Sequence, residues 1–424
     1  MLRSSPVYFQ VLFFAAILGW LFLAQLFWFL AATRAVRKIR SPRWNRLCRI
    51  LIIAAALVLA WIVLDRMFLG RVLIRRGSGN WISTAAQLWL LPSAFGYLLI
   101  KLVHAAEWMW HGILWLIQRT AGDPVQAPVG QVKAVPPRRQ FFHYAAVISG
   151  AAPVAAALYG YSHERLNFTV HRVDLPIANL PLALDGFRIV QLSDLHIGPF
   201  MPSEQIRRAV DIANDLGAHV AFVTGDFVTG RADPLDDCIA ELSRLRTPLG
   251  AWGCNGNHEI YAHFEDRAQE LFRQHGMTLL RQQNAALPWR GREFNLIGVD
   301  YQRERVPGGG RVPMLQGIES LIRRDRPNIL LSHNPNSFYR ASAMGIELSL
   351  AGHTHGGQVQ VEILHSQLSP ARFMTNFIAG PYSLPLSSAA SSSRLYVNRG
   401  LGTIGVPARF GVDPEISLLT LRSA

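Results

Sequence analysis

Thirty consecutive positions, from Ser4 to Thr33, carry no charged side chain. About 20 apolar residues are enough for a helix to cross the hydrocarbon core of a membrane. The run is too long for a secretory signal peptide and has no small-residue cleavage site. It therefore predicts a transmembrane helix. An ordinary soluble protein is excluded, since the 424 residues are 50% hydrophobic and only 17% charged.

More apolar runs follow the first one, over residues 51–64, 81–118 and 141–161. The middle run contains only Lys101 and Glu107 as charged residues. At ~1.5 Å per residue it is too long for one span, so it predicts a tight pair of helices. Residues 1–161 are therefore expected to form an all-α, multi-pass transmembrane region of about five helices, anchored in the cell membrane.

The formal net charge of +14 belongs entirely to this apolar region. Residues 1–160 hold 17 Lys and Arg against 3 Asp and Glu, whereas residues 161–424 hold 25 against 25. A basic excess between apolar runs is typical of loops at a membrane surface. The neutral remainder gives no support for binding a phosphate backbone, so the membrane is an expected partner and nucleic acid is not.

The charges of the loops do not decide on which side of the membrane the C-terminal part lies. With five spans, an outside N-terminus puts about eight cations in the cytoplasm and an inside one about nine, so the positive-inside rule does not separate them. The segment 136–152 has paired Arg138 and Arg139 before a moderately apolar stretch and resembles a twin-arginine export signal. Ordinary basic anchoring of a helix is the alternative. On this feature we expect the C-terminal part to be extracytoplasmic.

Residues 162–424 alternate short apolar runs with amphipathic stretches, which predicts an α/β domain built in layers. The apolar runs predict strands over residues 187–192, 219–224, 328–332, 347–352, 394–398 and 416–421. The amphipathic stretches predict helices over residues 203–216, 234–246 and 261–275.

Polar motifs occur at five places in this half, most of them directly after an expected strand. They are SDLHIG with Asp194 and His196, GDF with Asp226, GNHE with Asn257 and His258, SHNP with His333, and GHTHGG with His353 and His355. Two residues apart in extended chain, Asp194 and His196 point the same way, as two ligands of one ion would. A single His at a strand end is commonly structural, but five of the 14 His fall in these motifs. The set therefore indicates a site.

This order of motifs resembles the calcineurin-like metallophosphoesterase superfamily. The flanking segments LDGFRIVQLSDLHIG, YVNRGLG and PEISLLTL are also similar, and the membrane region resembles that of multi-pass transmembrane members. The resemblance implies an α/β fold over residues 162–424, a four-layer αββα sandwich with a binuclear metal site at the sheet edge.

The resemblance also implies a role for each motif residue. Ligands of a first ion would be Asp194, His196 and His355; ligands of a second would be Asn257, His333 and His353. Asp226 would bridge the two ions. His258 would contact the phosphoryl group and protonate the leaving oxygen, with Glu259 or Asp226 as the partner that keeps its proton.

Charge and ligand chemistry agree with that assignment. Two divalent ions about 3.5–4 Å apart can activate a water and clamp an in-line displacement. With two aspartates and a hydroxide the site keeps a formal charge of about +1, which suits an anionic phosphate ester. Neutral His and Asn beside carboxylates suit Mn, Fe, Zn or Co better than Ca.

The sequence therefore predicts a membrane-anchored phosphoesterase that hydrolyses phosphodiester or pyrophosphate bonds of lipids or envelope precursors by metal-activated water. Alternatives are a tethered phosphomonoesterase, a nucleotide phosphodiesterase, or a non-catalytic scaffold stabilised by metal. Candidate arginines for an anionic, lipid-linked substrate are Arg303, Arg305, Arg311 and Arg399. A solvated loop around the first three and a structural role for Arg399 are the competing interpretations.

Overall fold

In the computed structural model the chain divides into two compact units, one within residues 1–158 and one beginning at Tyr159 and ending at Ala424. The structure describes residues 6–67, 81–120, 137–302, 313–359, 361–363, 366–368, 372, 375–386 and 392–424. The two units are described separately below.

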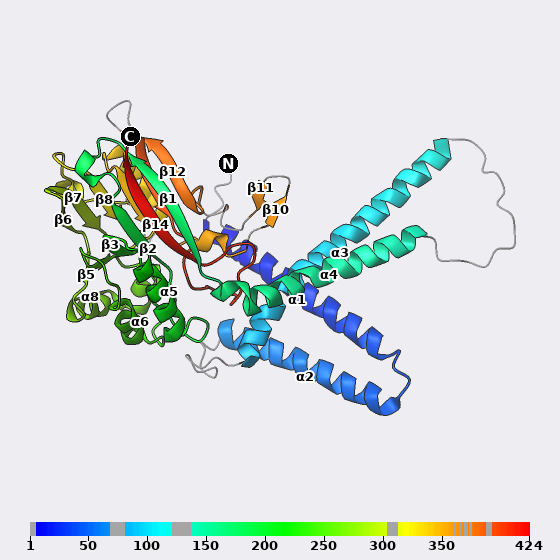
Figure 1. The fold of residues 1–424 in the computed structure, drawn as a ribbon. Helices are drawn as coiled ribbons and strands as arrows, with labels where there is room; N and C mark the ends of the chain where they lie inside the picture. Colours follow the sequence, from blue (N-terminus) through cyan, green and yellow to red (C-terminus); the bar gives the residue numbers. More distant parts are fainter. Residues whose placement is uncertain are drawn as a thin grey trace. The chain divides into compact units, whose positions relative to one another are not determined.

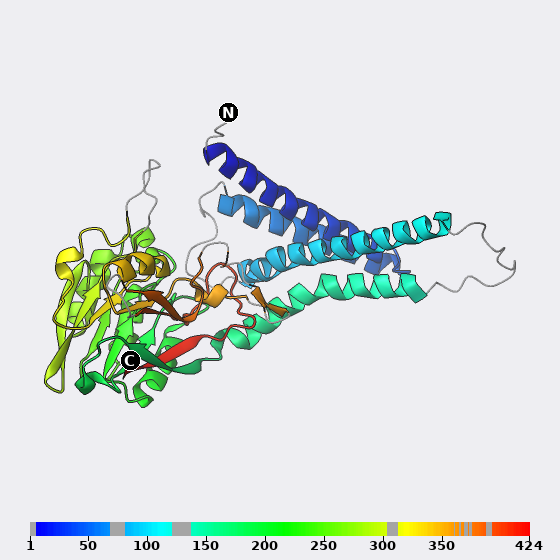
Figure 2. The same ribbon diagram turned by 90° about the horizontal axis from the view of Figure 1, so that it is seen from above.

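Four long helices make up the first unit (Figure 2). They are α1 (Pro6–Val36), α2 (Pro42–Met67), α3 (Trp81–Thr120) and α4 (Pro137–Ser162), whose last turn belongs to the second unit. Each of the four contains a segment long and apolar enough to cross a membrane. The prediction of several membrane-length apolar helices in this part of the chain is therefore confirmed.

The predicted pair of helices over residues 81–118 is wrong, because α3 is one helix of 40 residues. A tight helix pair needs a turn, and turns are favoured by Gly and Pro. α3 contains both, as Pro92, Gly96 and Gly112, yet its backbone stays helical through each of them. The described residues therefore give four long helices instead of about five.

Two six-stranded sheets form the centre of the second unit (Figure 1). The first has the order β1 (Thr169–Ile177), β14 (Glu415–Ser423), β2 (Arg188–Leu192), β3 (Val220–Val223), β4 (Ala251–Gly253), β5 (Thr278–Leu279). The second has the order β12 (Gly380–Pro385), β13 (Ser392–Val397), β9 (Leu348–Ala351), β8 (Asn328–Leu331), β7 (Arg292–Gly298), β6 (Gln283–Trp289). β10 (Val361–Ile363) and β11 (Ser366–Leu368) form a separate antiparallel pair.

Both sheets are mixed. Strands β2 to β5 run parallel in the first sheet, as do β7, β8, β9 and β13 in the second. Antiparallel strands occur as β14 beside β2 and as the edge strands β6 and β12. The parallel strands matter most for function, because their carboxyl ends meet at one edge of each sheet.

Helices lie against the outer faces of the sheets. They are α5 (Ser203–Asp215), α6 (Leu235–Leu242), α7 (Asn257–Ala262), α8 (Glu265–Gln274) and α9 (Phe338–Ala343). The 3₁₀ turns are η1 (Glu164–Leu166), η2 (Leu182–Leu184), η3 (Glu319–Leu321), η4 (Pro335–Ser337) and η5 (His355–Gly357). The predicted helix over 261–275 is interrupted, since His263 adopts the left-handed conformation at φ 55° between α7 and α8.

Side-chain alternation along the strands produces the layers. In β2, Val190 and Leu192 pack with α5, α6 and α8 in one core, whereas Ile189 packs into a second core between the sheets. The second core also contains Phe294 of β7 and Leu350 of β9. A smaller core joins β7 and β8 to α9 on the far face. The predicted four-layer αββα fold is therefore confirmed.

Candidate metal centre

The five polar motifs come together where parallel strands of the two sheets end. Asp194 follows β2, Asp226 follows β3, and Asn257 begins α7 just after β4. His333 follows β8, and His353 and His355 follow β9. The sequence therefore brings one set of side chains from each sheet to a common edge, as expected for loops at the carboxyl ends of parallel strands.

Five of these residues have the left-handed backbone conformation that side chains other than Gly seldom adopt. Their φ angles are 50° for Asp194, 49° for His196, 57° for Asp226, 75° for His353 and 52° for His355. Each such residue costs on the order of 1–3 kcal/mol unless the surroundings impose it. The concentration of this strain at one place marks a functional site.

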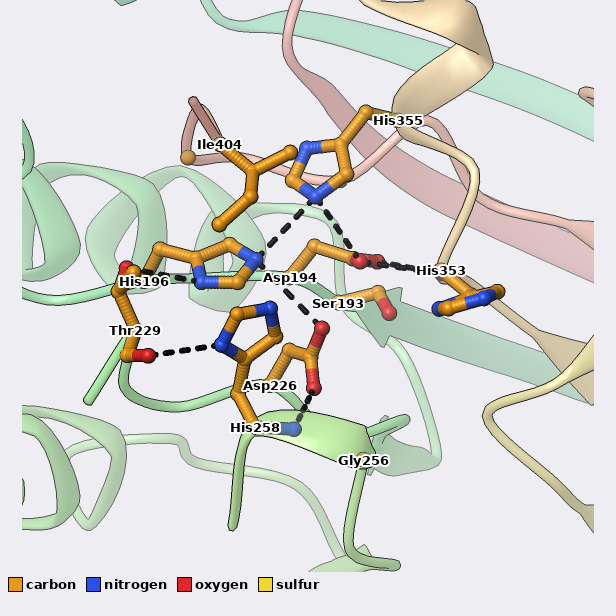
Figure 3. A network of polar contacts seen from close by, with 12 residues as sticks. Ser193, Asp194, His196, Asp226, Thr229, Gly256, His258, His353, His355 and Ile404 are labelled. Carbon is orange, nitrogen blue, oxygen red and sulfur yellow. Dashed lines mark hydrogen bonds and ion pairs between the residues drawn. The ribbon is translucent and has the colours of Figure 1, made fainter. Parts of the chain in front are cut away.

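A first group of ligand atoms belongs to Asp194, His196 and His355, all buried and within 4.8 Å of one another (Figure 3). Nε2 of His355 lies 3.3 Å from Oδ1 of Asp194 and 3.2 Å from Nε2 of His196. Converging imidazole nitrogens beside a carboxylate form a mixed N/O set suited to a divalent transition metal.

Asp226, His333 and His353 form a second group of the same size. Nε2 of His333 lies 3.1 Å from Oδ2 of Asp226, and Nε2 of His196 lies 3.5 Å from the same oxygen. Asp226 thus lies between the two groups. The bridging role that the resemblance implies for Asp226 stays a prediction.

Asn257 adds an amide oxygen to this cluster. Its side chain is buried, and its Oδ1 finds no hydrogen-bond partner among the described residues. A buried acceptor without a partner costs about 1–3 kcal/mol. A cation bound here would accept Oδ1 of Asn257 as a ligand, beside the His nitrogens and Asp oxygens of the two groups. The residues present therefore fit two divalent ions.

Hydrogen bonds on the far side of the rings fix their orientation. Nδ1 of His333 lies 2.5 Å from the carbonyl oxygen of Thr224, and Nδ1 of His196 lies 3.1 Å from that of Val228. A carbonyl only accepts, so each Nδ1 carries a proton, and each Nε2 presents a lone pair to the site when the ring is neutral.

Burial also controls the protonation of these groups. It raises the pKa of Asp194 to about 6, lowers that of His196 to about 3 and lowers the pKa of His355 as well. Burial acts to lower the pKa of His333, but the charges of Asp226 and Asp194 outweigh it and raise this pKa to about 10. His196 and His355 are therefore neutral at neutral pH, whereas His333 must lose a proton when it binds a metal.

His258 lies at the edge of the cluster with a different environment. Its ring is perpendicular to that of His196 with the centroids 4.8 Å apart, and its Nδ1 lies 2.8 Å from the carbonyl oxygen of Thr229. Asp226 accepts from the backbone N–H of His258, not from the ring. The hydrogen-bond partner of the ring is therefore the Thr229 carbonyl rather than Glu259. Asp226 stays close to the ring, since one ligand atom of each of His196, Asp226 and His258 lies within 4.8 Å of the others.

Glu259 has a structural task instead. Its buried carboxylate accepts from the backbone N–H groups of Asp226, Phe227, Val228 and Gly256, at 2.8–3.3 Å. These bonds hold the loop that carries Asp226 against the start of α7. Burial, together with the charge of Asp226, raises the pKa of Glu259 to about 7.

Of the candidate arginines, the structure describes Arg399, which does not join the cluster. Nη1 of Arg399 donates to Oε2 of the buried Glu415 at 2.5 Å, so its guanidinium is occupied by an ion pair. Arg303, Arg305 and Arg311 lie outside the described residues.

Three further residues contribute to the site although the sequence did not indicate them. Thr229 supplies the carbonyl for His258, Arg409 lies fully buried beside His355, and Gly352 leaves room for Asp194. A Cβ at Gly352 would come within 2.3 Å of Oδ2 of Asp194. Gly352 is the first glycine of the segment AGHTHGG and could have indicated this close packing. The sequence around Arg409 contains no feature that indicates the site.

Comparison with known proteins gives a consistent result. Residues 187–357 match the family model for calcineurin-like phosphoesterases. The chain is 29% identical over 279 residues to "Transmembrane protein with metallophosphoesterase domain" of Danio rerio, covering 63% of this chain and 60% of that protein. It is 31% identical over 266 residues to the Bos taurus protein of that name, covering 60% and 57%.

A bacterial relative matches over its whole length. The "Uncharacterized metallophosphoesterase YkuE" of Bacillus subtilis (strain 168) is 28% identical over 295 residues, which cover 68% of this chain and 98% of that protein. The chain spans less than two thirds of the two vertebrate relatives. Together with the fold and the buried Asp/His cluster, these matches identify the region around residues 187–357 as a calcineurin-like metallophosphoesterase domain, which follows four candidate membrane helices in the sequence.

Proposed function

We propose that the protein is a membrane-anchored di-metal phosphoesterase that hydrolyses phosphodiester or pyrophosphate bonds. The observation that carries the proposal is the pair of ligand groups with Asp226 between them. Figure 3 shows the first group together with Asp226. Two ions bound there would supply Lewis acidity and a nucleophilic water, the usual chemistry of paired metal sites. Which of Mn, Fe, Zn or Co the chain binds depends on supply as well as on ligands.

His258 is the residue that we assign to the leaving group. Its backbone is held by Asp226 and its Nδ1 by the Thr229 carbonyl, so the other ring nitrogen is left for a substrate oxygen. A proton delivered there neutralises the departing alkoxide or phosphate. A non-catalytic scaffold would have no use for a histidine fixed in this way.

The candidate membrane helices favour a substrate at the membrane. Phosphate esters and pyrophosphates of lipids or envelope precursors have their reactive bonds at the level of the headgroups. Tethered hydrolysis of a soluble phosphomonoester or nucleotide is the alternative, and the substrate panel below separates the two.

The four helices also bear on the orientation. If all four cross the membrane, both ends of the region lie on the same side as the connection between α2 and α3. The other side then receives seven cations of residues 34–49 and four of residues 118–139, eleven in all. Arg3 and the four arginines of 65–80 make five on the first side. The positive-inside rule therefore favours a cytoplasmic location for the eleven and an extracytoplasmic metal centre.

Hydrolysis by the purified full chain tests the function. The protein in detergent is stripped of metal, reloaded with Mn²⁺, Zn²⁺ or Mg²⁺, and given mono- and bis-nitrophenyl phosphate, a nucleotide and a lipid pyrophosphate in mixed micelles. We expect metal-dependent turnover, fastest on the micellar substrate. Absence of turnover with every metal and substrate, in protein that binds two ions, would refute the proposal.

Reporter fusions at Ala424 test the orientation. A periplasmic phosphatase reporter is expected to be active and a fluorescent cytoplasmic reporter dark. The reverse pattern would contradict an extracytoplasmic metal centre.

A further inference from the structure

The last turn of α4 belongs to the same compact unit as the two sheets. There Gly160 lies directly against the backbone of Arg409. A Cβ at Gly160 would come within 2.0 Å of the Arg409 carbonyl oxygen, and the Arg409 N–H points at the Gly160 carbonyl at 3.5 Å. Only a glycine allows these two backbones to approach so closely.

The side chain of Arg409 turns from this contact toward the metal centre. It is fully buried, and its Nη2 donates to the carbonyl oxygens of Arg399, Gly400 and Gly402 at 2.6–3.0 Å. The same nitrogen lies 3.5 Å from Nδ1 of His355. The hydrogen bonds thus go to backbone carbonyls, so this cation fixes the shape of a loop beside a proposed ligand.

The loop 399–402 in turn lies on Asp194. The Gly402 N–H donates to the Asp194 carbonyl at 2.7 Å, and the Leu401 N–H donates to the Ser193 carbonyl at 3.0 Å. A Cβ at Gly400 would come within 2.6 Å of the Asp194 Cβ. Continuous contacts therefore lead from Gly160 through Arg409 to Asp194 and His355.

A second set of contacts leads from the same part of the chain to the third member of the first group. Nη1 of Arg165 donates to the Phe200 carbonyl at 2.6 Å, and the Tyr161 ring meets the Phe200 ring edge-on. Phe200 lies four residues after His196, in the segment that connects β2 to α5. Glu164 accepts from the Gly411 N–H at 3.0 Å, which ties the two sets together.

We propose that residues 159–166, the exit segment of α4, position the ligands of one of the two ions. The contacts lead to Asp194 and His355 through the loop 399–402 and Arg409, and they reach the segment that carries His196 at Phe200; these three ligands form the first group. The second group is held differently, His333 by the Thr224 carbonyl and Asp226 by the N–H of His258 and the Glu259-bound loop. The proposal rests on the binuclear centre proposed above. It makes the attachment of the domain to its last membrane helix part of the metal site.

Gly160→Ala tests this with little change to the helix itself, since Ala is a good helix former. We expect full-length Gly160→Ala protein in detergent to bind one Co²⁺ ion per chain under conditions where the wild type binds two. The absorption of bound Co²⁺ should fall to about half, and the affinity for the missing ion should drop at least tenfold, in the range known for residues that orient metal ligands. Gly112→Ala is the control, because no heavy atom lies within 4 Å of a Cβ built there.

Arg409→Met gives a second measurement that does not depend on α4. It keeps the length of the side chain and removes the fork of donors, and we expect the same loss of one ion in protein whose circular dichroism is unchanged. Arg409→Lys retains the charge with one nitrogen and is expected to behave like Arg409→Met. Two ions at wild-type affinity in Gly160→Ala and Arg409→Met would overturn the proposal.

These measurements use metal binding alone and need no substrate. A wild-type chain that binds two ions and hydrolyses nothing would refute the proposed function while leaving the test of the exit segment readable.

Discussion

The two sheets contribute different chemistry to the metal centre. Both carboxylates, Asp194 and Asp226, follow strands of the first sheet, and so does the amide of Asn257. The second sheet contributes only imidazoles, from His333, His353 and His355. The negative charge that attracts cations therefore comes from the first sheet, which also supplies His196 and Asn257, whereas the second sheet adds further imidazole ligands. The core between the sheets is what assembles the site.

Asp226→Asn should have the largest effect, because this carboxylate of the first sheet lies between both ligand groups. We expect loss of both ions and a fall in turnover on the order of 10³-fold or more, since bound ions contribute several kcal/mol to the transition state. Metal analysis and nitrophenyl phosphate hydrolysis measure the two effects. Asp215→Asn on the surface of α5 is the control, and an Asp226→Asn chain with two ions would contradict the bridging position.

His258→Ala tests whether a residue that follows a strand of the first sheet can act in catalysis without binding metal. Removal of a general acid lowers turnover by about 10²–10⁴-fold, and here both ions should remain bound. His275→Ala, at an exposed position beyond α8, should leave turnover unchanged. If His258→Ala protein turns over substrate at the wild-type rate, the acid role belongs elsewhere.

Acid should weaken metal binding in two stages, one from each sheet. The pKa of His333 is raised to about 10 and that of Asp194 to about 6, so both groups hold protons more tightly than their unperturbed forms. Between these two pKa values, each decrease of one pH unit is expected to lower the metal affinity about tenfold, because His333 must release a proton to bind the metal. Below pH 6, each unit lowers the affinity about a hundredfold, because Asp194 must then release a proton as well. Titration calorimetry with Mn²⁺ from pH 8 to pH 5 measures the slope. An affinity independent of pH would contradict this assignment.

Gly352→Ala probes the place where the sheets meet and should have the smallest effect. The added methyl group would lie 2.0 Å from Oγ of Ser193 and 2.3 Å from Oδ2 of Asp194. Overpacking of this kind costs about 1–3 kcal/mol of stability. Thermal unfolding of the metal-free protein should show the loss. Gly230→Ala, at a glycine with open space around it, serves for comparison.

Much of the cluster was predictable because most of the motifs follow an apolar run directly. FRIVQL leads into SDLHIG and NILLS into SHNP, so strand and ligand are adjacent in the sequence. Parallel strands then bring these ends together without further information.

Other features had no such local signal. The partner of His258 is a backbone carbonyl, which any residue at position 229 could supply. Arg409 reaches its partners from far along the chain, and its neighbours in the sequence give no hint of burial. Helix α3 is longer than the ~30 Å thickness of a hydrocarbon core requires. The length of an apolar run therefore did not predict whether it forms one helix or two.

Titration of the metal-stripped full chain with Mn²⁺ is the most direct test of a di-metal phosphoesterase, with bound ions and hydrolysis of bis-nitrophenyl phosphate followed together. We predict that two ions bind per chain and that turnover appears only as the second site fills. Full turnover at one ion per chain, or none at two, would contradict the account.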